Sequence, residues 1–263
     1  MNGTFGTIHY RYFSNGKSTL AVILPGANLL PASHDKFIRL LSKKSNVLLI
    51  NEGYFGLQKL DGINFVIWQN RTNFCENLHK LLGKFPYKKL VLLTSSVGTV
   101  HGLTYAINYP QDVNALVLAA LPIGSNLLNN FLFLGTHLLL STKPDFLLPF
   151  VLRLYAFFSR TKKVAAVMEK TNKNIGARTY LLCLKEIAIF SIWYKKKYEE
   201  LIAGKNSPRT IIISGIDDPI FNRYCNTPLC QKASALYRVP ARHAPFVEAP
   251  EETYNIIQKF LMA

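Results

Sequence analysis

Two serines, a histidine and a pair of aspartates occur in this chain where they could perform nucleophilic chemistry. Ser95 and Ser96 follow the apolar run LVLL, and Gly98 and a helix-like stretch come directly after them. A serine hydroxyl is a poor nucleophile by itself, and it needs a base in contact, a group that orients the base, and donors for the oxyanion that forms. The segment is therefore either an ordinary polar loop or the place where one serine is presented for attack.

The candidate base and the candidate orienting acid lie toward the carboxyl end of the chain. His243 follows a short strand-like segment and precedes a closing helical segment, although a surface-loop histidine would fit there too. Asp217 and Asp218 come just after the buried run TIIISGI. His101 competes as a base because it lies five residues beyond Ser96, and a packed helical histidine is the alternative interpretation.

The elements that must position these residues alternate along the chain. We expect strands over residues 8–13, 18–26, 46–53, 88–95, 114–122 and 235–240 and a strand within 209–219 that ends before Asp217, and helices over 33–44, 73–85, 97–110 and 250–263. Ser33 is a plausible N-cap of the first helix. The pattern predicts an α/β fold with a mostly parallel β-sheet flanked by helices on both faces. Sites in such sheets lie at the carboxyl ends of the strands, where the serines and aspartates occur.

A long segment without strand signals interrupts this alternation. We expect residues 1–122 and 206–263 to form the core domain and residues 123–205 to form an inserted helical cap, or lid, over the same edge of the sheet. The insertion is rich in large apolar side chains, and it carries half of the net positive charge of the chain. Its apolar runs either pack on the core or form an acyl pocket or an interfacial surface.

Several of these segments resemble motifs of the α/β-hydrolase fold superfamily, in its esterase- and lipase-like branch with a helical cap. TSSVG resembles the nucleophile elbow G-x-S-x-G, with Ser96 in the place of the nucleophile. Thr94 departs from this motif, and so does Thr99, where a second glycine is frequent. GIDDP resembles the turn that carries the acid, and RHAPFVEAP resembles the segment that carries the base.

The resemblance implies a role for each of the candidate residues. Ser96, Asp218 and His243 would form the catalytic triad, in the chain order of this fold. VILPGAN resembles the loop that carries half of the oxyanion hole, so the backbone N–H groups of Ala27 and Val97 would bind the oxyanion. The resemblance covers the whole chain except the insertion.

The expected reaction is hydrolysis of a carboxylic ester or thioester with an apolar acyl part, through an acyl-enzyme. Aminopeptidase-like amide hydrolysis and carbon–carbon bond hydrolysis use the same triad and stay open. A catalytically inactive protein that binds a ligand or a partner is a further alternative, because the elbow lacks its usual glycines.

No metal or organic cofactor is expected for this chemistry. The glycines do not form G-x-G-x-x-G or G-x-x-x-x-G-K-[ST], which argues against dinucleotide and phosphate-cradle sites. The four cysteines form no CxxC pair, and no His/Cys group has zinc spacing. We expect buried thiols rather than a bridge between Cys225 and Cys230.

The formal net charge of +16 favours acidic partners, unless it reflects only a lysine-rich proteome. Basic residues beside apolar ones in the cap suit an anionic membrane surface or an acidic carrier protein. Nucleic acid is disfavoured because no nucleic-acid-binding motif accompanies the charge. The first residues include no apolar core of signal-peptide length, and no uninterrupted apolar stretch of about 18 residues occurs, so we expect a cytoplasmic protein.

Overall fold

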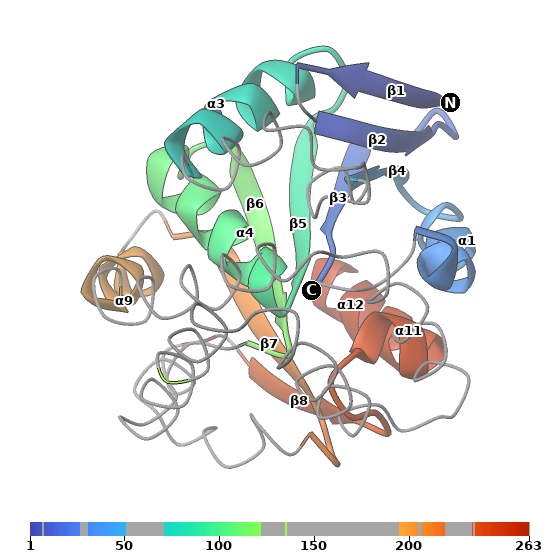
Figure 1. Ribbon diagram of the computed structural model, residues 1–263. Coiled ribbons are helices and arrows are strands. Elements are labelled where there is room, and N and C mark those ends of the chain that lie inside the picture. The colour runs from blue at the N-terminus through green and yellow to red at the C-terminus, as the bar shows by residue number, and fades with distance from the viewer. Residues whose placement is uncertain are drawn as a thin grey trace.

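The described residues form a layered α/β structure around one β-sheet (Figure 1). The computed structural model describes residues 1–6, 8–26, 31–50, 71–121, 135, 195–204, 207–218, 233 and 235–262. The predicted cap, residues 123–205, lies almost wholly outside these ranges, so the division into core and cap stays a prediction.

The sheet has eight strands within the described part of the chain, in the order β1-β2-β4-β3-β5-β6-β7-β8. The strands are β1 (Asn2–Phe5), β2 (Ile8–Phe13), β3 (Thr19–Leu24), β4 (Asn46–Ile50), β5 (Lys89–Ser95), β6 (Val113–Ala119), β7 (Arg209–Gly215) and β8 (Ala235–Val239). β1 and β2 pair antiparallel, β2 pairs antiparallel with β4, and all other pairs are parallel. The predicted mostly parallel sheet is therefore confirmed.

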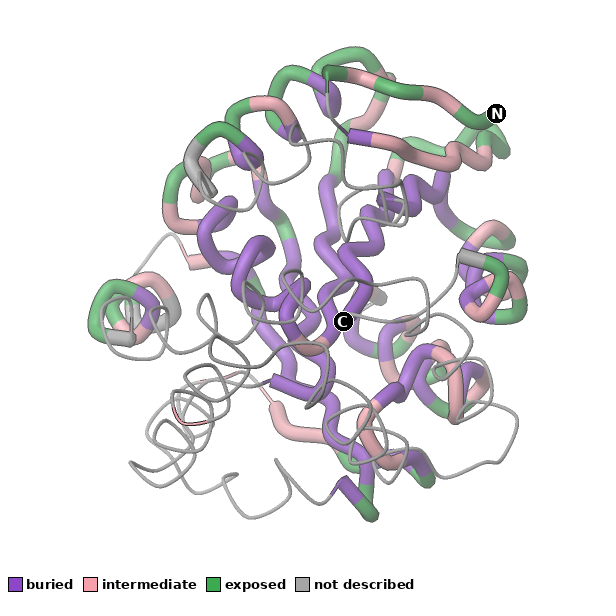
Figure 2. The backbone as a smooth tube through the Cα atoms, in the orientation of Figure 1, coloured by how far each residue is buried: buried purple, intermediate pink, exposed green. Residues whose placement is uncertain are grey.

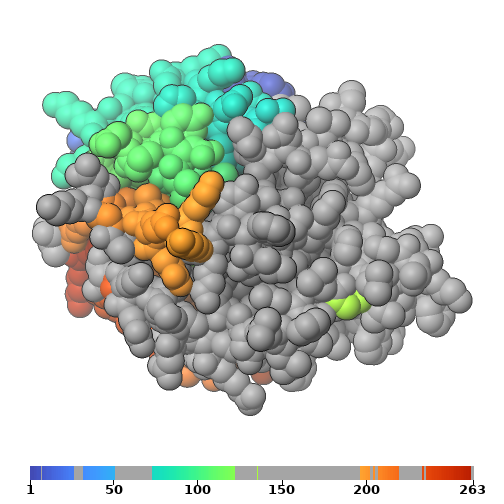
Figure 3. Space-filling view, turned by 90° about the vertical axis from the view of Figure 1, so that its left-hand side faces the viewer, coloured from blue at the N-terminus to red at the C-terminus, as the bar shows by residue number. Residues whose placement is uncertain are grey.

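Helices cover both faces of the sheet (Figure 1). They are α1 (Asp35–Leu41), which follows a 3-10 turn over Pro31–His34, then α3 (Arg71–Leu82), α4 (Val97–Asn108), α9 (Lys195–Ala203), α11 (Pro245–Glu248) and α12 (Pro250–Met262). One apolar core lies between the sheet and α3, α4 and α9, and a second lies between the sheet and α1, α11 and α12. Figure 3 shows α9 (orange) at the surface beside α4 (green).

Residues along the central strands alternate between these two cores. In β5, Leu90 and Leu92 belong to the core beneath α4, whereas Val91 and Leu93 belong to the core beneath α12. This alternation follows from the two-residue period of a strand, and apolar residues on both faces produce the continuous apolar runs of the sequence. The central strands are consequently buried along most of their length (Figure 2).

The register brings the carboxyl ends of the parallel strands to one edge of the sheet. Leu24 of β3 lies beside Thr94 of β5, and Ser95 lies beside Ala119 of β6. Gly215 of β7 lies beside Val239 of β8. The chain segments that leave these strands therefore start close together, and they carry the serine, the aspartates and the histidine.

Two local predictions need correction. Ser33 is not the N-cap of the first helix, because the 3-10 turn ahead of α1 places His34 at that position, with no side-chain capping bond. β1 was not predicted, since NGTF is a short edge strand of exposed and partly buried residues with no apolar run. Cys75 is a buried free thiol as expected, whereas Cys225 and Cys230 lie outside the described residues.

Within the described ranges, no helix is long and apolar enough to cross a membrane.

Candidate active site

Ser96 lies at the turn between β5 and α4, in a backbone conformation that few residues adopt. Its φ is +51° and its ψ is −124°, a combination that costs a non-glycine residue about 1–3 kcal/mol. Two backbone bonds hold this turn: the Ser96 N–H donates to the Ala119 carbonyl at 2.9 Å, and its own carbonyl accepts from the Thr99 N–H at 2.9 Å. Ser96 is partly exposed and Ser95 is buried, so only Ser96 is presented at the tip of the turn.

The turn is tight at two glycines, Gly98 and Gly26. A Cβ at Gly98 would lie 2.3 Å from the Leu24 carbonyl oxygen and 2.5 Å from that of Pro25. A Cβ at Gly26 would lie 3.1 Å from the Cβ of Ser96. The end of β3 therefore packs directly on the serine turn: a side chain at Gly98 would clash with backbone atoms, and one at Gly26 would fit only if its neighbours shifted slightly.

The two threonines that depart from the elbow motif fit this turn. Thr94 is fully buried, and its hydroxyl donates to the Val117 carbonyl at 2.9 Å. Its methyl group occupies space left free by Gly102 on α4, where a Cβ would lie only 2.3 Å from the Thr94 Cγ2. The Thr99 hydroxyl donates to the Ser96 carbonyl and so adds to the bonds that hold the turn.

One chain of hydrogen bonds joins the three predicted residues. The His243 Nε2 lies 2.9 Å from the Ser96 Oγ, and the Nδ1 of the same ring lies 3.0 Å from the Asp218 Oδ2. A carboxylate only accepts, so the Nδ1 carries the proton and donates it, and the Nε2 accepts from the serine hydroxyl. The Ser96 hydroxyl makes no capping bond to α4, which leaves it available to the histidine.

Asp218 and Asp217 have different surroundings. The side chain of Asp218 is fully buried against His243, whereas Asp217 is exposed, and its backbone N–H donates to the Ala241 carbonyl. Gly215 allows this arrangement, since a Cβ there would lie 1.9 Å from the Arg242 carbonyl oxygen. The acid loop and the histidine loop therefore contact each other through their backbones.

Glu248 holds the histidine loop from its other end, and sequence reasoning gave it no role. Its Oε2 accepts a bond of 2.7 Å from the backbone N–H of Arg242, the residue before His243. In the sequence, the only indication of a role was that Glu248 begins the Glu-x-Pro segment ahead of α12. The carboxylate fixes the loop backbone beside the histidine, so Glu248 is a candidate positioning residue.

Val97 is one of the two predicted oxyanion donors, and it is the first residue of α4. The first N–H groups of a helix lack intrahelical acceptors, and the partial positive charge there favours an anion. No described residue accepts a hydrogen bond from the Val97 N–H. Ala27, the other predicted donor, lies outside the described residues, although Gly26 ahead of it contacts Ser96.

His101 does not join this chain of hydrogen bonds. It is buried within α4, and its ring packs against Phe74 at 4.9 Å between ring centroids. Its carbonyl accepts a long bond from the Cys75 thiol. It is therefore the packed helical histidine that the sequence offered as the alternative. Among the described residues, no group of three or more His, Cys, Asp or Glu side chains could hold a metal ion.

The sequence alone has no match, but the structure resembles many solved structures. No protein-family model matches the chain, and no curated protein matches its sequence. A bromoperoxidase from Bacillus anthracis superposes with a TM-score of 0.75 at 15% identity, covering 100% of both chains. A hydrolase of 2-hydroxy-6-oxo-6-phenylhexa-2,4-dienoate from a Rhodococcus strain gives 0.72 at 14% identity, covering 100% of this chain and 98% of the other. A bacterial membrane phospholipase A gives 0.71 at 16% identity, covering 100% of this chain and 85% of the other.

These similarities extend over the whole chain, and they confirm the fold that the motifs indicated. The chain has the α/β-hydrolase fold, with an eight-stranded, mostly parallel sheet in its described residues. At such low identity the similarity shows the fold alone, and the activity has to be argued from the site itself.

Proposed function

We propose that this protein is a serine hydrolase in which Ser96 is the nucleophile, His243 the general base and Asp218 the group that orients the base. The observation that carries the proposal is the unbroken chain of hydrogen bonds from the Ser96 Oγ through the imidazole to the buried carboxylate. Serine at a strained strand-to-helix turn, with both imidazole nitrogens engaged, is the arrangement that acyl transfer requires.

The geometry suggests how the steps would proceed. The Ser96 Oγ attacks the substrate carbonyl carbon while its proton passes to the His243 Nε2, and Asp218 stabilises the imidazolium through the Nδ1–H. The Val97 N–H and the start of α4 stabilise the oxyanion. The tetrahedral intermediate collapses, and the leaving alcohol or thiol takes the proton from the Nε2. Water then attacks the acyl-enzyme through the same base and releases the acid.

We propose a carboxylic ester or thioester with an apolar acyl part as the substrate. Ile216 supports an apolar acyl part, because this large apolar residue is 48% exposed and lies only two residues from Asp218. The similarity to a phospholipase A also favours an ester. The similarity to a dienoate hydrolase keeps carbon–carbon bond hydrolysis as the second candidate, since the same triad could serve it.

A fluorophosphonate probe tests the proposal directly. The wild-type protein should gain the mass of one phosphonyl group, and Ser96→Ala should gain none while keeping the wild-type thermal unfolding midpoint. Ser95→Ala is the matched control, and we expect it to be labelled like the wild type. Absence of labelling in the wild type would favour an inactive binding protein.

A panel of p-nitrophenyl esters of increasing acyl length would then define the substrate class. An apolar acyl site predicts that kcat/KM rises with chain length up to a limit set by the size of the site. A labelled protein that cleaves none of these esters, but does cleave a dienoate, would move the assignment to carbon–carbon bond hydrolysis.

We also propose that the basic insertion captures an acidic carrier protein or an anionic membrane surface. Lys196 and Lys197 on α9 are exposed, and the insertion carries half of the +16 net charge. Exposed cations would attract an anionic surface that bears the substrate, and so raise the concentration of substrate near the protein.

A further inference from the structure

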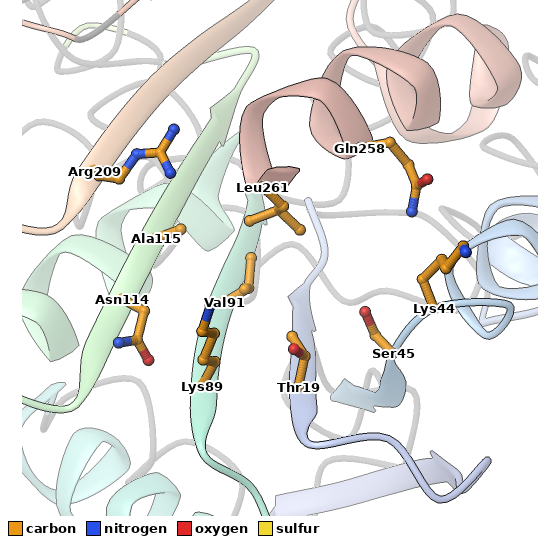
Figure 4. Close-up of a pocket in the computed structure, with 10 residues that line it drawn as sticks. All are labelled: Thr19, Lys44, Ser45, Lys89, Val91, Asn114, Ala115, Arg209, Gln258 and Leu261. Atoms are coloured by element: carbon orange, nitrogen blue, oxygen red, sulfur yellow. The ribbon is translucent and has the colours of Figure 1, made fainter. Parts of the chain in front are cut away.

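A pocket lies at the edge of the sheet opposite to Ser96, where the parallel strands begin. Ten residues line it, and it has a volume of about 400 Å³ (Figure 4). They are Thr19, Lys44, Ser45, Lys89, Val91, Asn114, Ala115, Arg209, Gln258 and Leu261. Lys89 is the first residue of β5 and Ser95 is the last. At about 3.3 Å per residue, the pocket is roughly 20 Å from the serine turn. It is therefore separate from the candidate active site.

The charged lining of this pocket has a single sign. Lys44, Lys89 and Arg209, here called the cationic rim, line it near the starts of β4, β5 and β7, with Lys44 and Arg209 at opposite sides (Figure 4), and none of the ten lining residues is acidic. Within the described part of the chain, neither lysine side chain forms an ion pair. The rim is thus a local excess of positive charge with no described counter-ion.

Arg209 is the most fixed member of the rim. One of its Nη groups donates to the Phe260 carbonyl at 2.7 Å, and its guanidinium lies 4.7 Å from the centre of the Phe260 ring. These contacts hold the guanidinium beside the last turn of α12. A guanidinium has five donors, and no other residue in the described ranges accepts a bond from those of Arg209.

Neutral donors and an apolar surface complete the pocket. The Asn114 Oδ1 accepts a bond of 2.7 Å from the Leu90 N–H, and among the described residues the amide NH₂ of that side chain has no acceptor. Val91, Ala115 and Leu261, here called the apolar floor, lie between the polar groups (Figure 4). Val91 and Ala115 are buried within the core beneath α12. Cations and amide donors around an aliphatic floor match a ligand with one anionic end and one apolar end.

We infer that this pocket is a second binding site, for a small organic anion whose acidic group lies beside Lys89, the central member of the cationic rim, and whose aliphatic part lies on the apolar floor. The acidic group is a carboxylate or a phosphate, since both accept several hydrogen bonds from such donors. The volume suits a small molecule, because ligand pockets span about 300–1,000 Å³. The ligand does not compete with substrate at Ser96, and the site does not depend on the proposed hydrolase activity.

Calorimetric titration with hexyl phosphate at low ionic strength tests this inference. Lys44→Gln/Lys89→Gln should raise the Kd about fivefold, since it removes the exposed cation beside the acidic group and a second one across the pocket. The matched control is Lys43→Gln/Lys88→Gln, which removes two neighbouring exposed lysines that do not line the pocket. Both variants have the same net charge, and the control should keep the wild-type Kd within about twofold.

Three further ligands identify what the site recognises. Hexanoate should bind if a carboxylate is accepted, and its affinity relative to hexyl phosphate distinguishes the two kinds of acid. Inorganic phosphate should bind more weakly than hexyl phosphate because it does not contact the apolar floor. Hexanol should show no difference between the rim variant and the wild type. The inference is overturned if hexyl phosphate does not bind, or if both double variants weaken it equally, since overall charge would then explain the binding.

Discussion

Gly102→Ala should destabilise the protein only because Thr94 lies opposite to it. Gly102 is an interior residue of α4, and a Cβ there would lie 2.3 Å from the Thr94 Cγ2, closer than real Cβ contacts. The next nearest atom is the Thr94 Cβ, at 3.3 Å, a tight contact that small shifts can accommodate. The clash is therefore mainly with one methyl group, which Thr94→Ala removes.

The structure sets the expected magnitudes of this double-mutant cycle. Overpacking in a core costs about 1–3 kcal/mol, whereas alanine in place of glycine within a helix gains about 1 kcal/mol. Gly102→Ala alone should therefore lower the free energy of unfolding by up to about 2 kcal/mol. In the Thr94→Ala background the clash is gone and the helical gain remains, so the same substitution should be neutral or stabilising. The coupling between the two positions should be about 1–3 kcal/mol.

Urea unfolding of the wild type, the two single variants and the double variant measures this coupling. Gly83→Ala is a suitable control, since a Cβ there would meet its nearest atom at 3.6 Å, and its effect should not depend on residue 94. Equal destabilisation by Gly102→Ala in both backgrounds would refute the packing argument. The effect of a side chain at position 102 would then not depend on Thr94.

The remaining predictions concern activity against a soluble ester. Asp218→Asn should lower kcat about 10³- to 10⁴-fold and Asp217→Asn only slightly, because only the buried carboxylate contacts the histidine; equal losses in steady-state assays would mean that the acid is misassigned. Glu248→Ala should lower kcat about tenfold by releasing the Arg242 backbone, at little change in KM, and Glu248→Gln should restore it because its amide oxygen can still accept; loss in both variants would point to a role of the charge instead. Replacing Lys195–Lys197 with glutamine should slow hydrolysis of an ester presented on anionic vesicles but not of the soluble ester, with a difference that fades with added salt; identical rates on vesicles at low salt would remove the capture proposal.

Most of the sheet was predictable because burial on both faces leaves continuous apolar runs in the sequence. LVLL is followed by Thr94 and TIII by Ser214, so the ends of β5 and β7 could be located to within a few residues. β1 was not predictable in this way, since an edge strand with half-exposed residues has no such run. Ser33 suited a cap by residue type, but the 3-10 turn moved the helix start beyond it.

The candidate site was predictable in its residues but not in its supports. Ser96, Asp218 and His243 were named from motifs, and the structure brings their side chains together. The fit of Thr94 was hidden because it depends on Gly102, eight residues away on the neighbouring helix. The contact of Glu248 with the loop backbone was hidden as well, since backbone hydrogen bonds leave little mark on residue type.

The close approach at Gly215 restricts how this scaffold could be re-engineered. A Cβ there would also lie 2.3 Å from the Ala241 carbonyl oxygen, so two carbonyl groups of the histidine loop occupy the space of a side chain. A loop transplanted from another protein would have to reproduce this backbone path to fit against β7. The segments around Asp218 and His243 are therefore interchangeable only as a matched pair, and libraries that vary one of them should recover few folded clones unless the other varies with it.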